Sequence, residues 1–106
     1  MKDTTNDKDM DVSFIDPEKE ILCYKNQYIV VDTKTDFIYI GKLIKISNAY
    51  ITLGDVDVHD SRETPTLKEK YILDARKYGV RQNRKLVHVR INEVISISLL
   101  EDIIEY

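Results

Sequence analysis

The sequence predicts a mainly β protein: a small, strongly bent, five-stranded antiparallel barrel with an N-terminal helix and a second helix inserted between strands three and four. Five short runs rich in β-branched and aromatic residues are separated by polar turns, which is typical of antiparallel strands. Two of these runs contain a glycine, which inside a strand usually marks a bend. The chain has 106 residues, of which 42% are hydrophobic, and this suffices for one such domain.

The N-terminal part begins with an acidic tail, residues 1–16, which we expect to be disordered because it is highly charged and has few aromatic residues. A helix start follows, with Asp16 as the N-cap, Pro17 in the first helical position and glutamates in the first turn. We expect this helix to end near Lys25. Cys23 has no readable catalytic partner and is expected to be a small buried hydrophobe.

Three strand runs come next, over residues 28–32, 37–46 and 50–58. The first two flank a polar turn at residues 34–36 and are expected to form a hairpin, and Ser47 and Asn48 turn the chain into the third run. Gly41 and Gly54 lie inside the second and third runs, so we expect a bend or bulge at each. Strands bent in this way curl into a closed or nearly closed barrel, which removes exposed sheet edges.

After the third run, the spacing of apolar residues changes to that of a helix. Thr64 is the expected N-cap, Pro65 the first helical residue and Gly79 the C-terminal cap. The apolar residues about one turn apart are Leu67, Tyr71, Ala75 and Tyr78. The remaining segments are expected strands at residues 85–90 and 94–99 and an acidic tail at residues 101–106.

Charge is distributed unevenly along the chain. The net charge of −3 separates into −5 for residues 1–67, +6 for residues 68–90 and −4 for residues 91–106. For binding an anion, such a local basic stretch matters more than the total charge. The stretch is equally explained as the solvated face of the inserted helix, and the residues alone leave both readings open.

Two segments resemble the sequence motifs of a known family. The segment from Tyr39 to Leu53, in which Gly41 and Leu43 precede a turn and an apolar strand, resembles the first Sm motif. The segment 87–97, with an arginine at the end of one strand, then a polar turn and an alternating strand, resembles the second. Over about residues 17–100 the chain therefore resembles the Sm, Sm-like (LSm) and Hfq-related group, with a long insert at about residues 59–84.

The resemblance implies an Sm-like (SH3-like) barrel. Subunits of this family usually assemble into rings by pairing strand four of one subunit with strand five of the next, and they bind single-stranded RNA around the pore. The family's pocket arginine is kept as Arg90, whereas Ser47 replaces an aspartate, Ile51 an asparagine and Ile91 a glycine. Asn48 lies close to the position of the missing asparagine.

The resemblance and the basic stretch together predict an RNA-binding or RNA-chaperone-type module that assembles with itself. It would contact RNA phosphates through the inserted helix and strand four, with weak sequence preference and a steep dependence on salt. The candidate RNA-binding residues are Lys68, Arg76, Lys77, Arg81, Arg84, Lys85, His88, Arg90 and Asn48. The alternative is a structural adaptor that binds a protein and not RNA, with its basic segment paired against acidic surfaces such as its own residues 101–106.

A third hypothesis concerns a metal ion. At strand spacing, Asp55, Asp57 and His59 point to one side, where two carboxylates and an imidazole could hold a divalent cation. The spacing matches no known metal loop, and the alternative is a solvent-facing strand edge followed by a turn that caps the next helix. We prefer this alternative, and we expect no cofactor and no small-molecule substrate.

Other classes of protein are disfavoured by what the sequence lacks. It contains no phosphate-binding loop, nucleophile elbow or zinc signature, so we do not expect an enzyme. It has no apolar run long enough for a membrane span and no secretory signal at its start. The single cysteine fits a reducing compartment, and we expect the protein in the cytoplasm.

Overall fold

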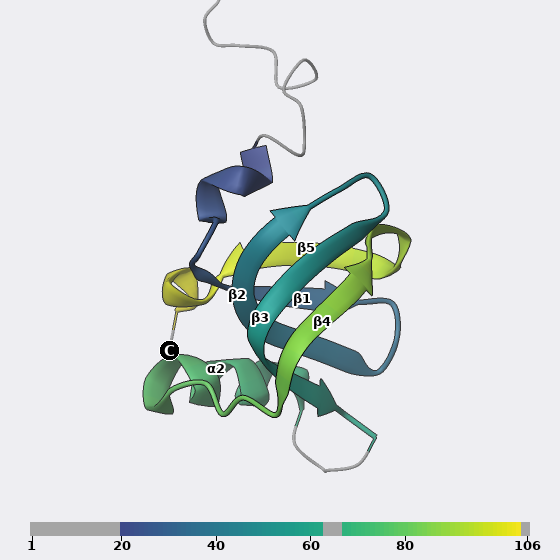
Figure 1. Cartoon of the computed structure of the whole chain (residues 1–106). Coiled ribbons are helices and arrows are strands. Elements are labelled where there is room, and N and C mark those ends of the chain that lie inside the picture. The colour runs from purple at the N-terminus through teal and green to yellow at the C-terminus, as the bar shows by residue number, and fades with distance from the viewer. Residues whose placement is uncertain (1–19, 63–66, 105–106) are drawn as a thin grey trace, which may run out of the picture.

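The computed structural model describes residues 20–62 and 67–104, which form one antiparallel sheet with a helix on its outer side (Figure 1). The strands are β1 (Tyr28–Thr33), β2 (Phe37–Ile46), β3 (Tyr50–Asp60), β4 (Arg84–Arg90) and β5 (Val94–Leu99), in the sheet order β4-β3-β2-β1-β5. The other described elements are the helix α2 (Lys68–Tyr78) and the 3₁₀ turns η2 (Leu22–Tyr24), η3 (Ile91–Glu93) and η4 (Leu100–Asp102). The mainly β class and the five predicted antiparallel strands are confirmed.

The bend in β2 and β3 centres on Gly41. This residue faces two residues of β3, Asp55 and Val56, where regular pairing would place one. The bulged Asp55 has a φ of 50°, in the left-handed region. A Cβ atom on Gly41 would lie 3.0 Å from Val56 Cγ2 and 3.1 Å from the carbonyl oxygen of Gly54, so the two strands approach too closely here for a side chain. The predicted bend is therefore present, and it reorients the residues that follow it on β3.

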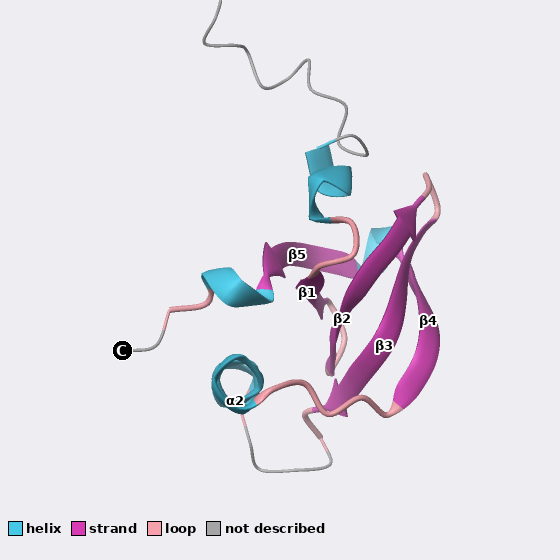
Figure 2. Ribbon diagram, turned by 60° about the vertical axis from the view of Figure 1, so that its left-hand side comes forward, coloured by secondary structure: helices cyan, strands magenta, loops and turns pink. Residues whose placement is uncertain are grey.

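Alternating side chains of the sheet enter two separate cores. The inner core lies within the curved sheet, and its buried members are Ile29, Val31, Leu43, Ile51, Leu53, Val56 and Val89. The outer core lies where α2 and η4 pack on β1 and β2, and its buried members are Val30, Ile38, Ile40, Ala75 and Leu100. Figure 2 looks along α2 and shows the helix against one side of the sheet, away from β4. We call the outer surface of β1 and β2 beneath α2 the covered face.

The sheet has two edges, β4 and β5, which are joined in sequence by η3. Within the described residues no pairing connects these two strands, so the barrel stays open along this seam. The expectation that curling removes exposed edges is not met by a single chain. Each edge strand also exposes an apolar side chain, Leu86 on β4 at 53% and Ile95 on β5 at 63%.

The helix α2 starts later than the sequence suggests. Leu67 is its N-cap residue, in extended conformation and without a side-chain capping bond, and the proposed start at residues 64–65 lies outside the described residues. Its end is as predicted: Gly79 has a φ of 102°, and its N–H donates to the carbonyl oxygen of Ala75 at 2.9 Å. No helix in the described part of the chain is both long and apolar enough to cross a membrane.

The two ends of the chain depart from expectation in different ways. The acidic tail at residues 1–16 and the proposed helix start at Asp16 and Pro17 lie outside the described residues. In the described segment, the chain is helical at residues 20–21 and then continues as η2, where Cys23 is exposed and not buried. At the other end, Ile103 of the expected acidic tail packs against the outer core.

Candidate nucleic-acid interface

The turn between β2 and β3 and the turn between β4 and β5 meet at one end of the sheet. The N–H of Ile91 donates to the carbonyl oxygen of Ala49 at 2.9 Å, and Tyr50 and Arg90 are direct partners in the β3–β4 register. Together the two turns line a hollow of about 240 Å³ formed by Asn48, Ala49, Tyr50, Arg90, Ile91 and Asn92. We call it the loop pocket. It unites two candidate residues, Asn48 and Arg90, that are far apart in the sequence.

The three substituted family positions have structural roles here. The hydroxyl oxygen of Ser47 accepts from the backbone N–H groups of Ala49 at 3.2 Å and Tyr50 at 3.1 Å, so it holds the turn together. Ile51 is buried in the inner core, and Ile91 packs against that core. The polar groups that the loop pocket offers therefore come from neighbours of these positions, the amides of Asn48 and Asn92 and the guanidinium of Arg90.

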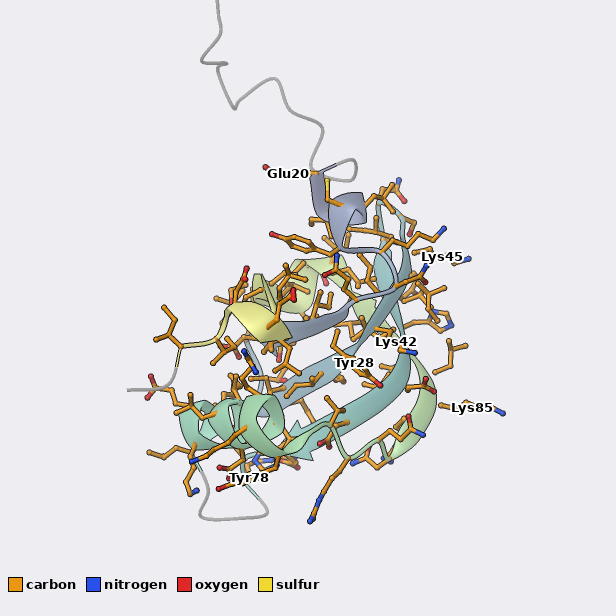
Figure 3. The ribbon with its side chains drawn as sticks, turned by 90° about the vertical axis from the view of Figure 1, so that its left-hand side faces the viewer. Glu20, Tyr28, Lys42, Lys45, Tyr78 and Lys85 are labelled. Carbon is orange, nitrogen blue, oxygen red and sulfur yellow. The ribbon has the colours of Figure 1, made fainter. Side chains whose placement is uncertain are left out.

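A second hollow adjoins the first on the outer surface of the sheet. It has a volume of about 460 Å³ and is lined by Lys45, Ser47, Tyr50, Thr52 and His88. We call it the sheet pocket. Thr52 Oγ1 lies 2.9 Å from His88 Nδ1, and the rings of Tyr50 and His88 meet edge to face with their centroids 6.2 Å apart. Figure 3 shows Lys45 pointing outward from the sheet.

The outer surface of β3 and β4 is polar and uncovered, and we call it the open face. Val87 and Val89 of β4 point inward, so the alternate residues Leu86, His88 and Arg90 project outward, as the sequence predicts. Arg84 and Lys85, at the start of this edge strand, are exposed as well. Figure 3 shows Lys85 projecting into solvent and Tyr78, at the end of α2, away from it.

The candidate cations of α2 lie elsewhere and contact the chain itself. Lys68 Nζ donates to Asp32 Oδ1 at 2.8 Å and to the carbonyl oxygen of Thr35 at 3.1 Å. Arg76 Nε donates to the carbonyl oxygen of Glu101 at 3.3 Å. Lys77 Nζ lies 5.5 Å from the centre of the Tyr78 ring. The basic stretch is thus divided between two parts of the molecule, the helix and the edge strand.

The remaining candidate, Arg81, lines a hollow of about 310 Å³ between the sheet and α2. Asp57 and Asp74 line the same hollow, so acidic groups there offset the charge of the arginine. This hollow is therefore a poorer place for a phosphate than the loop and sheet pockets, which no acidic residue lines.

The grouping of Asp55, Asp57 and His59 as metal ligands is wrong. The bulge at Asp55 breaks the strand alternation, and this carboxylate lies 3.8 Å from Lys42 Nζ. Asp57 accepts a hydrogen bond from Asn83 Nδ2 at 3.3 Å, while the ring of His59 stacks on Tyr71 with the centroids 3.9 Å apart. Among the described residues, no three His, Cys, Asp or Glu side chains are grouped for a metal ion.

Comparisons with known proteins place this geometry in a structural context. No protein-family model and no curated protein sequence matches the chain. Among solved structures, the chain is similar to the Pyrococcus abyssii Sm protein in complex with a uridine heptamer, with a TM-score of 0.54, 19% identity and coverage of 79% of this chain and 97% of that one. It is also similar to a chain of the NatC complex bound to Gag peptide and CoA, with a TM-score of 0.50, 16% identity and coverage of 74% and 89%. The chain therefore has an Sm-like fold.

Proposed function

We propose that this chain is an Sm-like RNA-binding module that binds single-stranded RNA at the loop pocket, with the cations of β4 holding neighbouring phosphates. The observation that carries the proposal is the convergence of Asn48, Arg90 and Asn92 beside the exposed ring of Tyr50. A guanidinium binds phosphate oxygens in bidentate fashion, side-chain amides bind base edges, and an aromatic ring stacks on an unpaired base. All three kinds of contact with a nucleotide are available within one hollow.

The edge strand β4 supports the proposal through its charge. Arg84, Lys85 and Arg90 are exposed along a strand that spans roughly 20 Å at about 3.3 Å per residue. Cations placed at intervals along a strand suit a flexible polyanion, because each neutralised phosphate adds to the affinity without reading the sequence. We leave Lys68 and Arg76 out of the proposed site, since Lys68 pairs with Asp32 and Arg76 donates to the backbone carbonyl oxygen of Glu101.

The test is the salt dependence of binding to labelled oligouridine, measured by fluorescence anisotropy between about 50 and 200 mM salt. We expect the double variant Arg84→Ala/Lys85→Ala to lower the slope of log K against log salt by about 1.4, since each lost phosphate contact on a single strand removes about 0.7. The matched control is Lys25→Ala/Lys70→Ala, which removes the same charge elsewhere and is expected to leave the slope nearly unchanged. Equal slopes for the two double variants would refute this assignment.

Absence of any RNA binding at low salt would instead favour the adaptor alternative. Arg76 of the basic stretch contacts the C-terminal segment through the backbone carbonyl oxygen of Glu101. In that case the cations of β4 would face an acidic protein partner, most simply in the cytoplasm as the single cysteine suggests.

The open seam between β4 and β5 supports self-assembly as part of the same proposal. Both strands have unpaired backbone groups at one edge, and both expose an apolar side chain there, Leu86 and Ile95. Pairing of β4 in one copy with β5 in the next would satisfy these groups and could close into a ring. Light scattering on the full chain is expected to give the mass of an oligomer, and a monomer at all concentrations would contradict the self-pairing.

A further inference from the structure

We propose that Tyr50 separates two base-binding hollows, so that one chain binds two successive nucleotides of single-stranded RNA, one in the loop pocket and the next in the sheet pocket. Tyr50 is the residue that lines both hollows. Its side chain is 43% exposed, unlike the tyrosines that pack in the cores. This inference rests on the proposed function and extends it to residues of β2 and β3 outside the basic stretch.

The spacing of the two hollows follows from strand geometry. Tyr50 and Thr52 are two residues apart on β3, and their register partners Arg90 and His88 are two apart on β4, so both pairs lie on the open face. Two residues along a strand span about 7 Å. Two stacked bases with one aromatic ring inserted between them need nearly the same distance, since stacking repeats every 3.4 Å or so. A base on each side of the Tyr50 ring is therefore compatible with the sheet.

Contacts among its own lining side chains hold the sheet pocket in shape. Its floor is the hydroxyl of Thr52, a polar side chain only 4% exposed, which is bonded to His88 Nδ1. This bond and the edge-to-face contact with Tyr50 hold the imidazole in one orientation. His88 Nε2 has no partner among the described residues and remains available to a base edge or a phosphate. Imidazole rings that are held in this way are good surfaces for stacking a splayed base.

The positive charge that lines the loop pocket and the sheet pocket favours an anionic ligand. Arg90 lines one and Lys45 the other, and no acidic residue lines either of them. A strand of RNA that passes over Tyr50 would thus have a cation on each side for its phosphates. The hollow beside Arg81, with Asp57 and Asp74 in its wall, lacks this property and serves as the internal contrast.

The experiment uses the full chain with oligouridine that carries one 2-aminopurine base, whose fluorescence falls when it stacks on an aromatic ring. We expect His88→Ala to weaken binding roughly five- to hundredfold, as for loss of one stacked base, and Tyr50→Ala to weaken it more because both hollows lose a wall. Lys45→Ala is expected to lower the salt slope by about 0.7. Tyr78→Ala, which removes an exposed aromatic ring at the end of α2 outside both hollows, is the control and is expected to bind as the parent does.

His88→Phe keeps a ring in the pocket and is expected to recover most of the stacking and of the 2-aminopurine quenching. If Arg84→Ala/Lys85→Ala weakens binding while His88→Ala and Lys45→Ala do not, the second subsite is wrong and the proposed function stands. If the parent chain binds no oligouridine at low salt, the proposed function fails, and the two-nucleotide site fails with it.

Discussion

The covered face and the open face are outer surfaces of one sheet, yet they differ in both chemistry and role. On the covered face, Val30, Ile38 and Ile40 are buried beneath α2. On the open face, Tyr50, His88 and Arg90 are exposed and surround two hollows. The basic helix α2 thus packs on the sheet through Ala75, while Arg76 and Lys77 near its end are exposed like the cations of β4. A run of positive charge in the sequence shows where cations lie along the chain, but it does not show that they are divided between two parts of the molecule.

Among the variants that test this difference between the two faces, we expect the largest loss of stability from Ile40→Ala. Ile40 is fully buried against Ala75 and Leu100, so its truncation leaves a cavity beneath α2. We expect the free energy of unfolding to fall by about 2–5 kcal/mol in urea denaturation. RNA affinity of the folded fraction should not change, because the open face is not altered. Leu86→Ala on the open face is the matched control, with an expected loss of about 1 kcal/mol or less. Similar losses at both positions would show that the two faces contribute equally to stability.

A smaller effect is expected at the bend that separates the two ends of β3. In Gly41→Ala, the new Cβ would meet Val56 Cγ2 at 3.0 Å and the backbone of Gly54 at 3.1 Å, and neither can move freely. We expect a loss of about 1–3 kcal/mol in the free energy of unfolding, as for an overpacked core. Gly54→Ala is the informative partner: its Cβ would lie 2.7 Å from Ile44 Cδ1, the end of a side chain that is exposed enough to rotate. Thermal unfolding should therefore rank Gly41→Ala as the more damaging, and the reverse order would contradict this account of the bend.

Tyr71 of α2, which packs against the outer core over the covered face, makes the stability of this part of the molecule depend on pH. Burial raises the pKa of Tyr71 above its ordinary value of 10.0, and the neighbouring Asp57 carboxylate raises this pKa further. The unfolded chain therefore loses this proton first as the pH rises, so stability from the neutral phenol is present below pH 10 and declines above it. Tyr71→Phe has no such proton and is expected to lose less stability than the parent between about pH 10 and 11.

The measurement is urea denaturation of both proteins at neutral pH and near pH 10.5. At neutral pH we expect Tyr71→Phe to differ from the parent by about 1 kcal/mol or less, because the stack on His59 is kept. Tyr39→Phe is a useful comparison, since burial also raises the pKa of Tyr39, which packs on the inner core. If Tyr71→Phe and the parent lost the same free energy of unfolding between these two pH values, the raised pKa of Tyr71 would be contradicted.

Much of the fold could be predicted because strand alternation is a local property of the sequence. The five strands follow from runs of β-branched residues, and the end of α2 follows from Gly79. The spacing of Leu67, Tyr71, Ala75 and Tyr78 predicts an apolar stripe. Ala75 is buried and Tyr71 packs against the outer core, whereas Leu67 and Tyr78 are more than 70% exposed. Apolar spacing identifies a helix better than it identifies the contact that the helix makes.

The errors at the candidate sites have a common physical origin. Polar and apolar residues alternate over positions 55–58, as they do in a regular strand. In the structure, Gly41 and Gly54 approach each other closely and a bulge forms at Asp55, which no local sequence pattern shows. The sheet pocket was missed for a related reason, since Thr52 and His88 are brought together by strand pairing across 36 positions. One signal was available: Thr52 is a polar residue between the apolar residues at positions 51 and 53, so it must point outward.

The smallest effect, and the sharpest test of the division between helix and edge strand, is expected from Lys68→Ala. Lys68 and Asp32 are each about one third exposed, so their ion pair should contribute only about 0.2–1 kcal/mol to stability. A double-mutant cycle with Asp32→Ala measures this coupling, because only the cycle separates the pair from the loss of each side chain alone. The same variant should leave the salt slope of RNA binding unchanged, since the ammonium group of Lys68 is held by Asp32 of β1 and by the carbonyl oxygen of Thr35 in the β1–β2 turn. A fall of the slope by about 0.7 would return Lys68 to the RNA interface and would extend that interface from β4 onto α2.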